Sequence, residues 1–129
     1  MKHSSITTTA TFIALYVTLG VGDDTFMSHF EYGQMLYEKP RGVACAACHG
    51  KYGEGGTIAR YKDENGKAYA LKAPAIATLD FTRFYRPFTP QGHSRKDIMP
   101  VYHLTRQEVR AIYDYLRDVR AQTKRRDDE

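Results

Sequence analysis

Two cysteines set the strongest constraint on how this chain can fold. Cys45 and Cys48 are the only cysteines among 129 residues, they lie three positions apart, and His49 follows directly. A shuffled chain of this composition gives that arrangement roughly once in two thousand orderings. Thiols at this spacing can both attach to one flat group, and the next residue then places an imidazole beside it. We expect the fold to form around this pentapeptide.

The pattern C-x-x-C-H is typical of haem attachment, with two thioether bonds to one haem and the histidine bound to its iron. A thioredoxin-like dithiol also uses C-x-x-C, but it requires a βαβ context, and here Gly, Pro and helical patterns surround the motif. A zinc site requires four ligands; no second cysteine pair exists, although His93 and His103 could contribute. The remaining alternative is a buried thiol pair beside a surface histidine.

Electron transfer without bond breaking requires a second axial ligand on the iron. The candidates are Met1, Met27, Met35, Met99, His29, His93 and His103. Met35 falls within a helical pattern, where packing is the usual role. Met99 lies in an extended stretch before Pro100, which lacks an N–H and stiffens a loop. We predict that Met99 is the distal ligand; packing of Met99 on the core is the alternative.

Residues 1–22 are interpreted as an export signal peptide. A basic start precedes the apolar stretch 12–21, and small residues suit cleavage before Asp23. The stretch is shorter than the ~20 residues of a membrane span. No transmembrane span is therefore expected in the mature chain, with an uncleaved anchor as the alternative. One domain, 23–129, is predicted to follow and to end in a short charged tail.

Helices are predicted at both ends of this domain. Thr105 and Glu108 form a capping box, and apolar residues then recur at helical spacing to about Arg120. The charged residues 124–129 are expected to be solvated and frayed. No nucleic-acid-binding pattern is visible, since the formal net charge of +4 is mild and no basic helix carries interleaved aromatic residues.

The first helix is predicted to end at Glu38, before Pro40, and two caps compete at its start, namely Asp24 or Thr25, and Ser28 with Glu31. It contains Gly33, which costs ~1 kcal/mol relative to alanine in a helix. The natural reason for a glycine at this position is the close approach of another helix.

The middle of the chain is expected to be mostly irregular, because prolines recur through it. Asn65-Gly66 is a strong turn signal between Tyr61 and Tyr69, and it predicts a short hairpin. A short helix is expected around residues 77–85.

The sequence resembles the class I monohaem cytochromes c, especially the small bacterial periplasmic ones. The resemblance covers about residues 26–120, and haem attachment, Met-Pro and terminal helix occur in the family's order. It is carried by residues 33–37, 45–50, 73–76, 99–105 and 112–116. The chain departs from the usual spacing in two places, with about four extra residues between Tyr37 and Cys45 and a long stretch from His49 to Pro74.

The resemblance implies an all-α fold in which the first and last helices cross near Gly33 and irregular loops wrap around one haem. The haem c would be covalently attached, and its iron would be bound by His49 and Met99. The carbonyl of Pro74 would accept a hydrogen bond from the ring of His49 and orient it.

The resemblance also implies a periplasmic one-electron carrier that is not itself an enzyme. Its partners would include a membrane-bound quinol-oxidising complex and a terminal oxidase or reductase. The alternatives are a haem subunit of a larger redox enzyme, and a haem-based sensor or catalyst with an open iron position. A basic ring is expected to steer acidic partners, against the alternative of evenly scattered charge; it would include Lys51, Lys72, Arg83, Arg86, Arg95 and Lys96.

Overall fold

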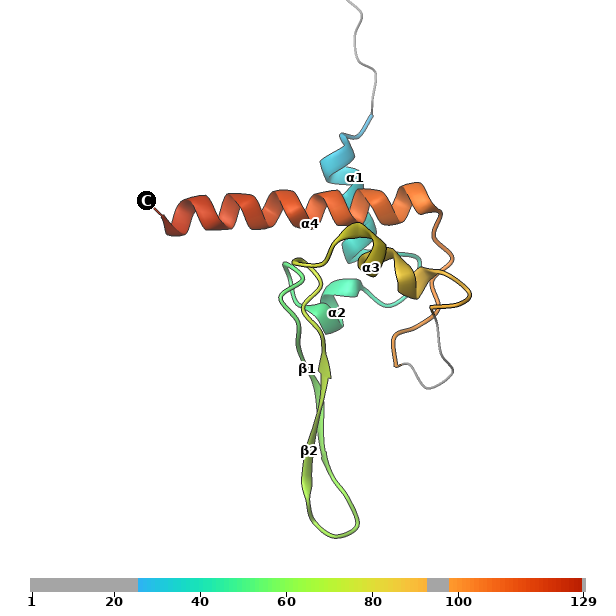
Figure 1. Ribbon diagram of the computed structural model, residues 1–129, viewed down its shortest axis with the longest axis vertical. Helices are drawn as coiled ribbons and strands as arrows, with labels where there is room; N and C mark the ends of the chain where they lie inside the picture. The colour runs from blue at the N-terminus through green and yellow to red at the C-terminus, as the bar shows by residue number, and fades with distance from the viewer. Residues whose placement is uncertain (1–25, 93–97, 129) are drawn as a thin grey trace, which may run out of the picture.

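The computed structural model describes residues 26–92 and 98–128. The elements are the helices α1 (His29–Glu38) and α2 (Cys45–His49), the strands β1 (Gly56–Lys62) and β2 (Ala68–Ala73), helix α3 (Phe81–Tyr85), the 3₁₀ turn η1 (Arg86–Phe88) and helix α4 (Arg106–Asp127). In Figure 1, α4 crosses α1, and the strands extend away from the helices as a narrow arm. The expected all-α class therefore needs correction, because a two-stranded sheet accompanies the helices.

The crossing of α1 and α4 forms the centre of the core. A Cβ added at Gly33 would overlap the backbone oxygen of Ala111, so only a glycine allows this approach. Beside it, the ring of Tyr115 contacts Phe30 and Tyr37 at centroid distances of 5.1 and 5.9 Å. Among the most deeply buried side chains are Leu36, Tyr37, Val109, Ile112 and Leu116. The predicted crossing at Gly33 is confirmed.

Helix α1 begins at His29 and is capped by Ser28, one of the two predicted caps; the alternative, Asp24 or Thr25, lies outside the described residues. The Ser28 side chain accepts a hydrogen bond from the N–H of Glu31, and the Glu31 carboxylate accepts one from the N–H of Ser28. This reciprocal pair satisfies two backbone donors that a helix start leaves free. The helix ends at Glu38, as predicted.

Helix α4 begins at the predicted capping box of Thr105 and Glu108 but continues to Asp127, well past the expected end near Arg120. The prediction of a frayed tail is therefore wrong for residues 124–127. Lys, Arg and Gln favour helix, and the positive charges of Lys124, Arg125 and Arg126 in the last turn interact favourably with the helix dipole.

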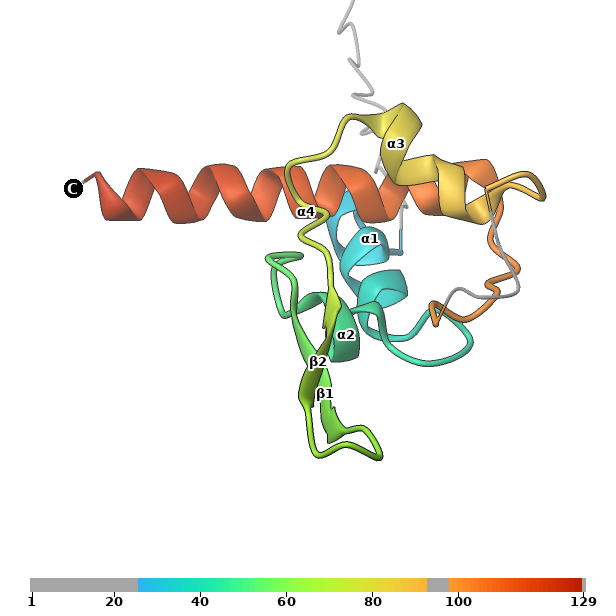
Figure 2. The ribbon, with the colours of Figure 1, turned by 60° about the horizontal axis from the view of Figure 1, so that its bottom comes forward.

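Strands β1 and β2 form an antiparallel hairpin that points away from the helices in both ribbon views (Figure 2). The hairpin is present as predicted; in it Tyr61 pairs with Tyr69, and their rings stack with centroids 5.5 Å apart. In the turn, Gly66 has φ 77°, and the Asp63 carboxylate accepts hydrogen bonds from the N–H groups of Asn65 and Lys67. Every residue of β1 is exposed, so the hairpin adds little to the core.

Helix α3 occupies the end of the segment 77–85 in which a short helix was expected. Asp80 caps it by accepting a hydrogen bond from the N–H of Arg83. The ring of Phe84 packs edge-on against Tyr113 of α4, at a centroid distance of 5.4 Å. Nowhere in the described part of the chain is a helix long and apolar enough to cross a membrane. The predicted export signal, 1–22, lies outside that part.

Candidate functional site

The C-x-x-C-H pentapeptide is itself a single helical turn, α2. Residues three apart lie on the same face of a helix, so Cys45 and Cys48 share one side. Gly50 follows with φ 82°, a conformation that ends the helix and favours glycine. The hydroxyl of the buried Tyr37 donates a hydrogen bond to the carbonyl of Gly50 at 2.6 Å. This bond fixes the end of α2 to the core helix α1.

The two thiols differ in exposure. Cys45 is buried, whereas Cys48 is half-buried. Burial raises the pKa of the Cys45 thiol to about 11. A thioredoxin-like reactive cysteine has a lowered pKa instead, and here the neighbouring strands form an antiparallel hairpin and not a βαβ unit. These two observations disfavour the redox-dithiol alternative.

The ring of His49 is oriented by a backbone carbonyl. Its Nδ1 lies 2.9 Å from the carbonyl oxygen of Pro74, which is the contact that the resemblance implied. Because a carbonyl can only accept, Nδ1 must carry the proton, and Nε2 keeps a lone pair that can bind a metal. Pro74 directly follows β2, and the N–H of Ile76 donates to the carbonyl of Gly53, so the acceptor is held by the loop beside α2.

A cavity of about 460 Å³ lies beside α2. Cavities of this size commonly hold small molecules and cofactors. Its walls are predominantly apolar and come from every region of the described chain between α1 and α4. The lining includes Tyr37, Cys45, Cys48, His49, Ile58, Leu71, Pro74, Ile76, Leu79, Phe84, Phe88, Ile98, Met99, Tyr102 and Ile112.

The structure brings four of the sequence-predicted residues to this cavity, namely Cys45, Cys48, His49 and Met99. Met99 is half-buried and comes from the irregular segment before α4.

The other described ligand candidates do not line the cavity. Met27 and Met35 are exposed, and His103 is exposed just before α4. His29 contacts the carboxylate of Asp114 at 3.3 Å. Two further candidates, Met1 and His93, lie outside the described residues.

The residues present suit haem. One apolar cavity is lined by two thiols on one face of a helix, an imidazole with a free Nε2 and a thioether sulfur. Within residues 26–92 and 98–128, no group of three or more His, Cys, Asp or Glu side chains is placed to hold a metal ion. The donor set therefore fits an iron carried in a flat organic ligand better than it fits a separately bound metal ion such as zinc.

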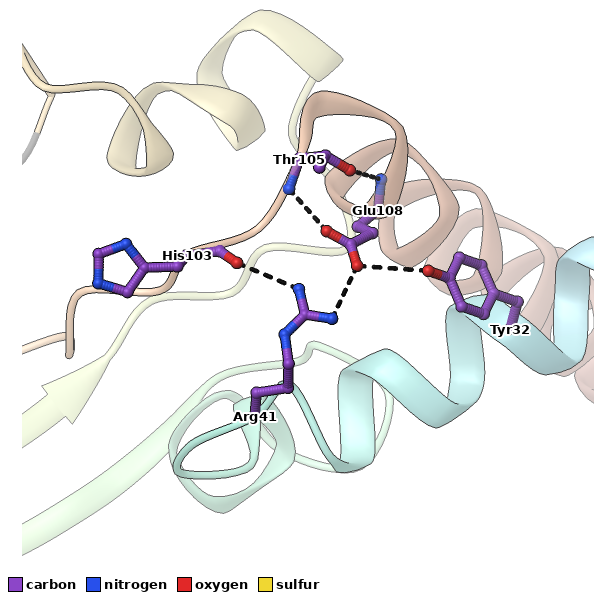
Figure 3. Close-up of polar contacts among 5 residues, drawn as sticks. All are labelled: Tyr32, Arg41, His103, Thr105 and Glu108. Carbon is purple, nitrogen blue, oxygen red and sulfur yellow. Dashed lines mark hydrogen bonds and ion pairs between the residues drawn. The ribbon is translucent and has the colours of Figure 1, made fainter.

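Sequence reasoning missed a polar network at the start of α4, shown in Figure 3. Arg41, in the loop after α1, donates hydrogen bonds to the Glu108 carboxylate at 2.8 Å and to the His103 carbonyl at 3.1 Å. The guanidinium of Arg41, together with the N–H of Thr105, lowers the pKa of Glu108 to about 2. The hydroxyl of Tyr32 also donates to this carboxylate, at 3.3 Å.

One signal for this network was present in the sequence. The extra residues between Tyr37 and Cys45 marked a loop that departs from the family's usual spacing, although nothing in the pattern gave the loop a role or named its partner. Arg41 and Glu108 are 67 positions apart, and an arginine in a loop carries no periodicity that would pair it with a helix cap.

Residues 30–120 match the family model described as Cytochrome c. Comparison with curated proteins gave no match, and comparison with solved structures gave none. The matched range is most of the chain and includes α1, the C-x-x-C-H helix, the cavity and most of α4. The chain therefore belongs to the cytochrome c family, whose members carry covalently bound haem c and transfer electrons through its iron.

Proposed function

We propose that this protein is a monohaem class I cytochrome c of the small bacterial periplasmic type, acting as a one-electron carrier. Cys45 and Cys48 form the two thioether bonds, His49 is the proximal ligand and Met99 is the distal ligand. The observation that carries the proposal is that all four side chains line one apolar cavity while Pro74 holds His49 in the metal-binding tautomer.

The residues of the chain have separate tasks in this mechanism. When bound, haem supplies an iron that exchanges one electron between its ferrous and ferric states. The two thioethers would fix the ring to α2, and the bond from His49 to Pro74 orients the imidazole so that its Nε2 can bind the iron. The Met99 thioether is a soft ligand that favours ferrous iron, and the apolar lining disfavours added positive charge, so both raise the potential.

The spectrum of the holoprotein tests the carrier proposal. A carrier whose iron is saturated by His49 and Met99 is low-spin in both oxidation states and binds carbon monoxide poorly. A high-spin iron that binds carbon monoxide readily would instead indicate the alternative of a sensor or catalyst. Purification of the native holoprotein from its source, followed by mass measurement of the complex, tests the other alternative of a subunit in a larger redox enzyme.

We propose that acidic redox partners dock beside the cavity. Of the predicted basic ring, Lys72 and Arg83 line the cavity, while Arg95 and Lys96 lie outside the described residues. The strand register adds two residues that the sequence prediction omitted. Arg60 and Lys62 pair with Ala70 and Ala68, so they share one face of the hairpin with Lys72.

This basic hairpin face (Arg60, Lys62 and Lys72) is exposed and meets the cavity at Lys72. Positive charge there would attract a negatively charged partner toward the haem. Suitable partners are a membrane-bound quinol-oxidising complex as donor and a terminal oxidase or reductase as acceptor. Such partners require export to the periplasm, and the mass of the mature protein would show whether residues 1–22 have been removed.

A further inference from the structure

The loop between α1 and α2, residues 39–44, lies against the segment that carries Met99. The hydroxyl of Tyr102 donates a hydrogen bond to the carbonyl of Val43 at 2.7 Å, and Arg41 donates to the carbonyl of His103 at 3.1 Å. Gly42 faces the same ring, since a Cβ added there would lie 3.4 Å from Tyr102. Two bonds therefore join this loop to the residues that follow Met99 by three and four positions.

The segment 98–104 has little else to hold it in place. It contains no helix or strand, and within the described part of the chain these two bonds are the hydrogen bonds that join residues 98–104 to the rest. Apolar contacts help, because the Tyr102 ring lies 6.4 Å from that of Phe88. The position of Met99 thus depends on contacts made by its neighbours.

Arg41 is itself held firmly. One guanidinium nitrogen donates to the carboxylate of Glu108, a residue that is only 8% exposed, and this carboxylate also accepts a hydrogen bond from the N–H of Thr105 at 2.7 Å. The Arg41 backbone has φ 61°, in the left-handed region that residues other than glycine seldom adopt. Such a conformation persists where the surroundings determine it strongly. The arginine therefore connects the rigid start of α4 to the irregular Met99 segment.

We propose that loop 39–44 is a latch, in which Arg41 and the Tyr102–Val43 bond hold the Met99 sulfur at the haem iron. Arg41 is a positioning residue, because it acts through Met99 and does not touch the haem itself. The latch sets how often the distal position opens to an external ligand. This inference rests on the proposed function, since it requires Met99 to be the distal ligand.

The test uses the ferric full-length holoprotein and imidazole as the external ligand. At saturating imidazole the binding rate approaches the rate at which the Met99–iron bond opens. Arg41→Gln removes both bonds of the guanidinium and should raise this rate about tenfold, while Tyr102→Phe removes one neutral bond and should raise it by about threefold. Arg41→Lys keeps a positive charge beside Glu108 but lacks the two guanidinium nitrogens that bond Glu108 and the His103 carbonyl together, so an intermediate rate is expected.

Two controls separate a latch from a general loss of stability. Arg110→Gln removes the surface ion pair with Asp114, and Val119→Ala creates a cavity in the core beside α4, away from loop 39–44. Neither control variant should bind imidazole faster than the general loss of its unfolding free energy explains. Urea unfolding of each holoprotein supplies that comparison.

The outcomes distinguish this proposal from the proposed function. The latch is overturned if Arg41→Gln binds imidazole at the wild-type rate, or if Val119→Ala accelerates binding as much as Arg41→Gln at equal loss of stability. In both cases the wild-type protein would still show the near-infrared charge-transfer band of a methionine–iron bond. If the wild-type protein lacks that band, Met99 is not the distal ligand, and the proposed ligation and the latch fail together.

Discussion

The crossing of α1 and α4 and the Met99 segment both contribute residues to the lining of one cavity, and different forces hold them. At the crossing, apolar and aromatic side chains are almost fully buried around Gly33. The Met99 segment is instead held by two hydrogen bonds to loop 39–44, one of which is donated by the exposed side chain of Arg41. A buried contact is sensitive to volume, whereas a polar surface contact is sensitive to charge and to hydrogen-bond donors. Substitutions can therefore perturb the crossing and the Met99 segment separately.

The largest effect is expected at the covalent attachment in α2. The double variant Cys45→Ala, Cys48→Ala removes both thiols, so haem should be extracted completely by acidified acetone. Wild-type protein should keep its haem in the same extraction. Haem that remains bound to the double variant would rule out the thioether proposal.

Met99→Ala is expected to have the next largest effect, confined to the Met99 side of the cavity. It should abolish the near-infrared band of the ferric protein, lower the potential and open the iron to carbon monoxide. Haem attachment should survive, because both cysteines and His49 remain.

Met35→Ala, an exposed position of α1, is the matched control for loss of a methionine. It should keep the band. If Met99→Ala kept the band while Met35→Ala or His103→Ala altered the ligation, the distal ligand would be a different residue.

Gly33→Ala tests the crossing. Alanine is the better helix former by ~1 kcal/mol, but its methyl group would meet the Ala111 backbone, and overpacking of this kind typically costs ~1–3 kcal/mol. We expect a net loss of unfolding free energy in urea with an unchanged near-infrared band. A stabilised Gly33→Ala protein would show that the two helices can move apart at little cost.

Acid should weaken the Arg41–Glu108 contact before it affects the crossing. The pKa of Glu108 is about 2 in the folded protein, against its ordinary value of 4.5. The unfolded chain therefore takes up a proton first, so this contribution to stability is complete above about pH 4.5 and is lost as the pH falls towards 2.

Unfolding free energies measured across that range test this expectation. Wild type should lose more stability than Glu108→Gln, and Arg41→Gln should shrink the difference because Arg41 is the largest cause of the shift. Identical pH dependence in wild type and Glu108→Gln would contradict the lowered pKa.

The smallest effect is expected on partner association. Reversal of the basic hairpin face by Arg60→Glu, Lys62→Glu and Lys72→Glu should slow electron transfer to an acidic partner by about tenfold at low salt, and the effect should fade as salt is added. The matched control reverses Lys124, Arg125 and Arg126 at the far end of α4. Equal slowing by both triple variants would indicate that net charge alone, and not the hairpin face, attracts the partner.

Features encoded locally could be predicted from the sequence. The capping boxes at Ser28 and Thr105, the Asn65-Gly66 turn and the C-x-x-C-H motif each depend on residues within five positions of one another, and the structure contains all of them in place. The glycine of the crossing could also be anticipated, because a glycine in an otherwise regular helix requires a reason.

The features that were not predicted depend on contacts between distant residues, which the sequence does not reveal. The hairpin was predicted from its turn, yet an all-α class was expected because the motifs that carry the family resemblance include no strand. Arg41, Val43 and Tyr102 meet across a long separation, and loops lack the periodicity that discloses a helix or strand. The length of α4 was underestimated because apolar spacing stops near Val119, although charged residues sustain a solvent-exposed helix equally well.

That exposed end of α4 has a practical consequence. Val119 is its last buried residue, and the helix continues to Asp127, about 12 Å further at 1.5 Å per residue. A spin label or an electrode tether placed at this end would stand at a fixed distance from the cavity, where a tether on a flexible tail would sample many distances. The exposed end of α4 can therefore serve as a rigid spacer in measurements of how the rate of electron exchange depends on the distance between the tether and the cavity.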